Sequence, residues 1–389
     1  MVHLSPGLRM VEGYPFEELD RRKMIALDAG RELIDFGVGD PRESTPAFIR
    51  EALVSALEPV SSYPRAAGLP ELREAICGWV QRRFGATLDP ATNLVPTLGS
   101  KELVFSLAQA VVDPAGRRDL VVVTAPGYPI PERGARFAGA EVRRVPLHEE
   151  NGFLADLDGV EATTWQRTAI LWLNYPNNPT GAVAPLEYLR RAAGLARSHG
   201  FLLASDEAYS ELWFDEDPPA SALQVGDLTN VVTLSTLSKR SSMTGYRSGF
   251  AAGDPDLIGA LKRLRPSVGV TPQEFVQRAS IAAWGDESHV ERSRELYGRK
   301  REVFKELFAS HDVHIAGSVA TFYLWVKVPQ GLTSVDWSLD LLERAGVIVA
   351  PGSFFGDEGE GYVRIAMVPS LEDCEKAAAS LDAILGVEA

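Results

Sequence analysis

Between about residue 93 and residue 253, short apolar runs alternate with longer amphipathic stretches. The apolar runs do not alternate with polar residues, which is the pattern of strands covered on both faces. Strands are expected at 94–98, 119–124, 141–147, 168–174, 201–205, 231–235 and 248–252, with helices at 101–111, 128–137 and 185–198. This order predicts an α/β fold with a mainly parallel, seven-stranded sheet sandwiched by helices.

The pattern changes after about residue 285. A long charged helix is expected at 288–309, followed by a strand at 320–328, another helix and a strand at 361–367. Strands and helices in this order are typical of an α+β unit. We therefore predict a large domain of residues 42–285 and a smaller α+β domain formed by residues 1–41 and 286–389.

Polar clusters follow several of the expected strands. Parallel α/β sheets bind ligands at the carboxyl ends of their strands, so clusters at those ends are expected to form one site. The clusters are Gly99-Ser100-Lys101, Pro126-Gly127-Tyr128, Asn177-Asn178-Pro179-Thr180-Gly181, Asp206-Glu207-Ala208-Tyr209 and Thr236-Leu237-Ser238-Lys239.

The segment around Lys239 combines groups that suit one kind of ligand. A lysine amine can condense with an aldehyde, and the hydroxyls of Thr236 and Ser238 with the guanidinium of Arg247 can hold a phosphate. Pyridoxal 5′-phosphate carries both an aldehyde and a phosphate. Taken alone, the segment could equally be a polar loop with a solvated lysine.

Asp206 ends an apolar run, and a buried carboxylate is unfavourable unless it meets a cation. A protonated pyridine nitrogen would be that cation and would keep the ring an electron sink; a helix N-cap is the alternative. Asn178 could donate to a ring phenolate, and Tyr209 could reach the same ligand. Tyr128 could stack on a flat ring. Asn178 also has an ordinary explanation as part of a plain turn, and Tyr128 as a packing residue at a helix start.

Composition narrows the function classes. The formal net charge of −14 disfavours nucleic acid or an anionic membrane as a partner. The six histidines show no metal-ligand spacing, so no metal is expected. Cys77 and Cys374 are expected to be separate reduced thiols, with a single disulfide as the alternative. Without a signal peptide or a spanning segment, the chain is expected to be cytoplasmic.

As a whole, the chain resembles a fold-type I, pyridoxal-phosphate-dependent aminotransferase of the aspartate aminotransferase superfamily. The likeness runs from the Phe-Gly-Val-Gly-Asp-Pro stretch at 36–41 to the Tyr-Val-Arg-Ile-Ala stretch at 362–366. It rests on Ser-Lys…Gly-x-Arg-x-Gly at 238–249, Asn-Asn-Pro-Thr-Gly at 177–181 and Asp-x-x-Tyr at 206–209. The resemblance implies a pyridoxal 5′-phosphate cofactor, small amino acid and 2-oxo acid substrates, and a homodimer with shared active sites.

The resemblance also implies roles for individual residues. Lys239 would be the catalytic Schiff-base lysine, with Asp206 on the pyridine nitrogen and with Asn178 and Tyr209 facing the ring oxygen. The further cofactor-binding residues would be Ser100, Lys101, Tyr128, Asn178, Thr236, Ser238 and Arg247, together with Tyr63 from the neighbouring subunit. Gly39, Asn178 and Arg364 would bind the substrate, Arg364 by its α-carboxylate. Thr236 replaces the serine usual in relatives but keeps the hydroxyl, and the Asn178–Pro179 bond is expected to be cis.

Three stretches, at 238–242, 279–284 and 322–325, are similar to the N-succinyl-diaminopimelate aminotransferases of bacterial lysine synthesis. They favour N-succinyl-LL-2,6-diaminopimelate and N-succinyl-2-amino-6-oxopimelate as one substrate pair, with glutamate and 2-oxoglutarate as the other. The alternatives are an aminotransferase for LL-diaminopimelate, aspartate or an aromatic amino acid, and a C–S β-lyase of the same fold. The sensor domain of a transcription regulator is disfavoured, since no basic winged-helix module is expected ahead of residue 36.

The stretch Gly39-Asp40-Pro41-Arg42-Glu43 differs from the Gly-Glu-Pro-Lys-His of those enzymes. This difference lies at the expected mouth of the pocket, where a succinyl carboxylate would be bound. Arg42 and Arg65 are the candidates for that contact, and the alternative is that both are solvated surface arginines.

Overall fold

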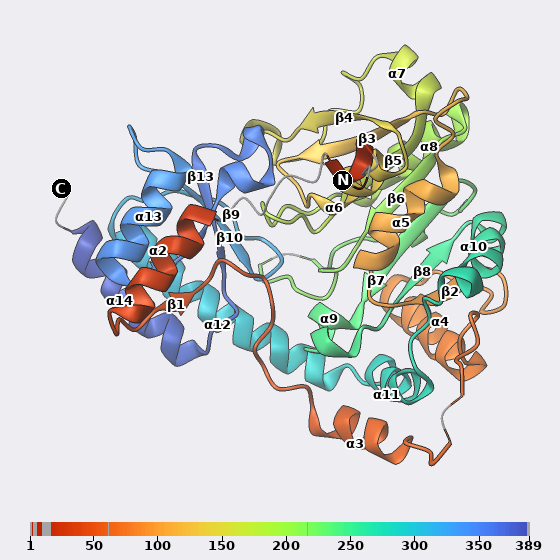
Figure 1. The fold of residues 1–389 in the computed structure, drawn as a ribbon, viewed down its shortest axis with the longest axis horizontal. Coiled ribbons are helices and arrows are strands. Elements are labelled where there is room, and N and C mark those ends of the chain that lie inside the picture. The colour runs from red at the N-terminus through yellow and green to blue at the C-terminus, as the bar shows by residue number, and fades with distance from the viewer. Residues whose placement is uncertain (1, 3–5, 10–16, 61, 216, 387–389) are drawn as a thin grey trace.

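The computed structural model describes the chain except residues 1, 3–5, 10–16, 61, 216 and 387–389 (Figure 1). Its largest sheet has the strand order β2-β8-β7-β6-β5-β3-β4. Only β8 runs antiparallel to its neighbours, so the sheet is mainly parallel as predicted. The strands are β2 (Leu94–Thr97), β3 (Leu120–Ala125), β4 (Glu141–Pro146), β5 (Thr168–Asn174), β6 (Leu202–Asp206), β7 (Val231–Thr236) and β8 (Gly249–Gly253).

Each of these strands lies within one residue of its expected limits at both ends. The surrounding helices are α3 (Ala47–Ser55), α4 (Pro70–Phe84), α5 (Lys101–Val111), α6 (Ile130–Phe137), α7 (Ala162–Arg167), α8 (Leu186–His199), α9 (Leu237–Arg240), α10 (Pro255–Val268) and α11 (Glu274–Gly285). Helix α6 begins two residues later than expected, because Pro129 and Pro131 define its first turn. Tyr128 therefore lies in the preceding loop.

The sheet is covered on both faces, which explains its uninterrupted apolar strands. In β5, Leu171 and Leu173 pack into the cluster that contains Leu189 of α8. Ile170 and Trp172 pack into the opposite cluster, together with the apolar face of α5. Successive residues of one strand thus belong to two separate cores, so both need apolar side chains.

A second, smaller sheet has the order β12-β13-β10-β9 and is antiparallel. Figure 1 shows it at the left of the molecule, with the long α12 running from beside α11 towards it. Its strands are β9 (Ile315–Gly317), β10 (Tyr323–Lys327), β12 (Ala350–Pro351) and β13 (Tyr362–Ala366), and its helices are α12 (Ser288–Ser310), α13 (Ser334–Ala345) and α14 (Leu371–Leu385). The sequence did not reveal the short β9 and β12.

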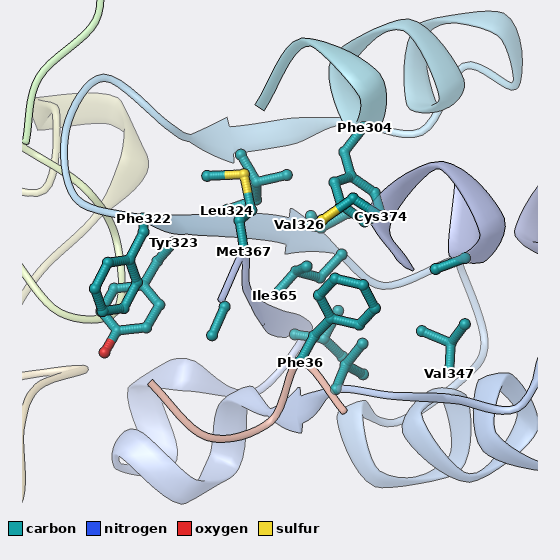
Figure 2. Close-up of a cluster of buried hydrophobic side chains, with 14 of the residues drawn as sticks. Phe36, Phe304, Phe322, Tyr323, Leu324, Val326, Val347, Ile365, Met367 and Cys374 are labelled. Carbon is teal, nitrogen blue, oxygen red and sulfur yellow. The ribbon is translucent and has the colours of Figure 1, made fainter. Parts of the chain in front are cut away.

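The N-terminal segment belongs mainly to this smaller unit. Its α2 (Glu17–Asp28) packs against α13, and its β1 (Ile34–Asp35) pairs in parallel with β11 (Val347–Ile348). The first helix, α1 (Pro6–Arg9), instead contacts α6 of the large-sheet unit, so the expectation that the whole segment belongs to the smaller unit is wrong for α1. Figure 2 shows Phe36 in the core of the smaller unit, among side chains from β10, β13, α12 and α14. The domain limits at residues 42 and 286 stay predictions.

Two further expectations concern single features. Cys77 and Cys374 are both free thiols, so the disulfide alternative is wrong. Within the described ranges, no helix is long and apolar enough to cross a membrane.

Phe36→Ala is expected to lower the free energy of unfolding by about 3–5 kcal/mol, because it leaves a cavity in a closed core. Phe36 is fully buried and meets Phe304 edge-on at 5.3 Å between ring centroids. Val38→Ala is the matched control, since Val38 is 51% exposed, and its effect should stay within about 0.5 kcal/mol. Urea unfolding measures both, and equal effects of the two substitutions would contradict this packing.

Candidate active site

One cavity of 530 Å³ lies at the carboxyl ends of the parallel strands, where the large sheet meets the smaller unit. Residues from both sheets and from the N-terminal segment line it. They include every residue predicted for the site within one chain, namely Gly39, Ser100, Lys101, Tyr128, Asn178, Asp206, Tyr209, Thr236, Ser238, Lys239, Arg247 and Arg364. The prediction that the polar clusters meet at one place is therefore confirmed.

Lys239 lies in α9, the short helix that directly follows β7. Thr236 caps this helix by accepting a hydrogen bond from the Ser238 backbone N–H at 3.1 Å. The Lys239 ammonium donates to the backbone carbonyl of Gly39 at 2.5 Å. Burial lowers the pKa of Lys239 to about 8; Asp40 opposes this shift, and Arg364 is among the cations that add to it. The amine is thus neutral at a much lower pH than an ordinary lysine.

Asp206 is the last residue of β6 and is only 6% exposed. Its carboxylate accepts one backbone N–H, from Ala208 at 3.3 Å, and meets no cation among the described residues. Burial raises the pKa of Asp206 to about 7. No helix starts after Asp206, because residues 208–211 form a turn, so the N-cap alternative is wrong. A cationic group placed against this carboxylate would remove the penalty of its burial.

Arg364 comes from β13 and is also 6% exposed. Its guanidinium donates to Asn178 Oδ1 at 2.9 Å and to the Gly37 carbonyl at 2.7 Å, and it lies 4.2 Å from the ring centroid of Tyr323. It has no carboxylate partner within the described chain, and its Nε has no hydrogen-bond acceptor. An incoming carboxylate would supply the missing anion.

An anion-binding cradle surrounds the start of α5. Arg247 donates only to the backbone carbonyls of Thr244 and Leu98, at 2.8 and 3.1 Å. Gly99 has a φ of +69°, and a Cβ there would lie 2.8 Å from the Arg247 guanidinium, so glycine is required. The free N–H groups at the start of α5 and the hydroxyl of Ser100 complete the cradle.

These features fit pyridoxal 5′-phosphate. The cradle suits its phosphate, the orphaned carboxylate of Asp206 suits its protonated ring nitrogen, and the amine of Lys239 suits its aldehyde. The Asn178–Pro179 peptide bond, which follows the cavity-lining residue Asn178, is cis as expected.

Tyr323 was not predicted as a site residue, although it lies in the 322–325 stretch that resembles the N-succinyl-diaminopimelate aminotransferases. The Tyr323 hydroxyl lies 2.8 Å from that of Tyr209, within hydrogen-bond distance. A Cβ at Gly39 would lie 2.0 Å from the Tyr323 hydroxyl, which explains the glycine at this position. Phe355 and Arg133 also line the cavity and were not anticipated.

The candidates Arg42, Arg65 and Tyr63 lie outside this cavity. Arg42 is exposed and donates to the Asp35 carbonyl at 3.3 Å, and neither Arg42 nor Arg65 is among the residues lining the cavity. Tyr63 does not line it either, and its side chain is fully exposed. The structure therefore gives these three residues no contact with the cavity of their own chain.

Similar proteins are found over nearly the whole length of this chain. A sequence model for "Aminotransferase class I and II" matches residues 31–381. An LL-diaminopimelate aminotransferase of Aquifex aeolicus is 38% identical over 382 residues, which cover 97% of this chain and 98% of that protein.

Two solved structures from Thermus thermophilus are also similar. A single mutant of the aspartate aminotransferase has a TM-score of 0.91 and 31% identity, covering 99% of this chain and 100% of its own. A probable N-succinyldiaminopimelate aminotransferase of the same organism has a TM-score of 0.87 and 33% identity, covering 95% of this chain and 99% of its own.

The cofactor-free protein should be loaded covalently by pyridoxal 5′-phosphate at a rate that rises with pH through about 8. The sign follows from the lowered pKa of Lys239, since only the neutral amine attacks an aldehyde, and it predominates above the pKa. Absorbance of the bound cofactor measures the rate, with Lys239→Ala as the blank. An inflection near pH ~10.4, the value for an ordinary lysine, would contradict the proposed environment.

Proposed function

Because the chain belongs to the class I and II aminotransferase family, we propose that it exchanges an amino group between glutamate and an amino acid with the diaminopimelate skeleton. The cofactor of this family is pyridoxal 5′-phosphate. When bound, it supplies an aldehyde for the amino group and a protonated ring that withdraws electrons from the substrate α-carbon. The one observation that carries the proposal is that Lys239, Asp206 and Arg364 line a single cavity. Among the described residues, Asp206 has no cationic partner and Arg364 has no carboxylate partner.

The substrate that we favour is LL-diaminopimelate. The support is the similarity over nearly the whole chain to proteins bearing that name, from Aquifex aeolicus and Nitratidesulfovibrio vulgaris among others. The N-succinyl form, expected from three short sequence stretches, is the second candidate, and the similarity to the probable N-succinyldiaminopimelate aminotransferase supports it. The two forms share one reacting end and differ only at the distal end.

Lys239 is proposed as the group that moves the proton. Its Nζ accepts the α-proton of the substrate, which requires the neutral amine that burial and Arg364 favour. The hydrogen bond to the Gly39 carbonyl holds Nζ at the centre of the cavity. Since Gly37, two residues earlier, accepts from Arg364, one short segment positions both groups.

Arg364 is proposed to bind the substrate α-carboxylate through a bidentate contact, which a lysine could not provide. Asn178 steadies the guanidinium by accepting from its Nη1. Asp206 stays ionised opposite the ring cation and stabilises the charge that develops during proton removal. Tyr209 is held in the cavity wall by its hydrogen bond with Tyr323.

We also propose that two chains form a dimer and share their sites. Tyr63 is fully exposed, and Val54, Leu57 and Val60 close to it in sequence are exposed apolar side chains. Burial of these side chains against a second copy would be favourable. The cofactor contact that the resemblance implies for Tyr63 needs such a copy, because Tyr63 does not line the cavity of its own chain. Sedimentation of the holoenzyme as a monomer would refute this part.

The decisive experiment is a glutamate-dependent assay with the 2-oxo forms of LL-diaminopimelate and N-succinyl-diaminopimelate, together with oxaloacetate, pyruvate and phenylpyruvate. One of the two diaminopimelate forms should give a kcat/KM at least about a hundredfold above the other acceptors, a difference of about 2.7 kcal/mol in transition-state binding. Lys239→Ala should abolish turnover without unfolding the protein. Highest activity with oxaloacetate would refute the substrate assignment.

A C–S β-lyase would behave differently in a second assay. Incubation of the holoenzyme with glutamate alone should convert the cofactor to its pyridoxamine form. Pyruvate release from cystathionine, without that conversion, would refute the aminotransferase assignment and favour the lyase.

A further inference from the structure

A second cavity adjoins the active site and shares a wall with it. Tyr128, Pro129, Arg133, Phe354 and Phe355 line both cavities. The second cavity therefore continues the first, on the side formed by α6 and the loop after β12. No step described above uses it.

The second cavity is basic, although the chain as a whole carries a formal charge of −14. Leaving Arg9 aside, its lining includes three arginines, Arg133, Arg136 and Arg144, against the two carboxylates Glu132 and Asp357, a difference of one positive charge. An excess of positive charge in a hollow of an acidic protein favours an anionic ligand.

Two of the arginines share one carboxylate. Arg136 and Arg144 both donate to Glu132, at 2.8 and 2.9 Å. Burial opposes ionisation of Glu132, but these hydrogen bonds outweigh it and hold its pKa below the usual value. Glu132 thus pairs with both guanidiniums, and Asp357 and Glu358 also stabilise the charge of Arg144.

Arg133 lies on the shared wall and, unlike Arg136 and Arg144, has no carboxylate partner among the described residues. Its side chain is half-buried, and it makes no hydrogen bond or ion pair with any part of the chain that the structure describes. Burial raises the pKa of the Tyr128 phenol, and the guanidiniums of Arg247 and Arg133 both oppose that rise. Arg133 is therefore close to Tyr128 on the active-site side, with donors available for a ligand.

We propose that Arg133 and the basic cavity form a subsite for the carboxylate at the distal end of the substrate. When Arg364 binds the α-carboxylate and Lys239 faces the α-carbon, a long substrate extends beyond these two contacts. Arg133 is available to its distal end because it lines the active-site cavity as well as the basic one. Both candidate substrates carry a distal carboxylate, which a guanidinium binds well. The inference rests on the proposed function only in taking the substrate to be a long dicarboxylic amino acid.

Binding of two simple acids to the holoenzyme tests the subsite without turnover. Pimelate has a carboxylate at both ends, whereas heptanoate has the same length and only one. By isothermal titration calorimetry, Arg133→Gln should weaken pimelate binding about tenfold, the loss of one charge-assisted contact. Heptanoate binding should change by less than about twofold, since it has no group for the subsite.

The matched control is Arg190→Gln, which removes the same charge from an exposed position on α8 paired with Glu187. It should leave both affinities unchanged, and melting curves establish that both variants are folded. Equal pimelate affinity in wild type and Arg133→Gln would overturn the proposal. So would an equal loss for pimelate and heptanoate, which would indicate a general disturbance of the active site.

Steady-state kinetics identify which distal carboxylate is bound. Arg133→Gln should raise KM about tenfold, with little change in kcat, for LL-diaminopimelate or for its N-succinyl form, and leave the KM of norleucine unchanged. A rise for norleucine as well would overturn the proposal. If neither diaminopimelate form is a substrate but pimelate binding still depends on Arg133, the proposed function fails and the subsite stands.

Discussion

The site depends on the burial of opposite charges that do not neutralise one another. Among the residues that the structure describes, Asp206 is buried without a cation, and Arg364 is buried without a carboxylate. Taking a charge out of water costs several kcal/mol unless a partner compensates it. A ligand with a cationic ring nitrogen and a substrate with a carboxylate would supply both partners. The unpaired charges of Asp206 and Arg364 are therefore complementary to the charges expected on the cofactor ring and on the substrate.

The two units of the fold are needed because these charges come from different sheets. Asp206 ends a strand of the large parallel sheet, whereas Arg364 lies within a strand of the small antiparallel one. The segment from Phe36 to Gly39 connects them, since its carbonyls accept from Arg364 and from Lys239. Phe36 anchors this segment in the smaller core (Figure 2). Packing of Phe36 in the smaller core thus helps to position the two carbonyls that accept from the amine and the guanidinium.

Much of this arrangement was predictable from sequence, because strand limits and strand-end polar clusters are local patterns. Contacts between distant segments were not. The hydrogen bond between Tyr209 and Tyr323 joins residues 114 positions apart, and no local pattern marks it. In the sequence, Arg133 looks like any other charged residue on an amphipathic helix. Only its place in the wall between the two cavities distinguishes it from the other arginines of that helix. The N-cap alternative for Asp206 failed because the following residues form a turn.

The buried carboxylate of Asp206 is proposed to pair with the cationic ring nitrogen of the cofactor. Asp206→Asn keeps the shape of the side chain and removes its charge, so the variant should fold and still bind pyridoxal 5′-phosphate through Lys239 and the cradle. Stopped-flow measurement of its reaction with glutamate should show proton removal slowed by at least about a hundredfold. An unchanged rate in a fully loaded variant would contradict the account.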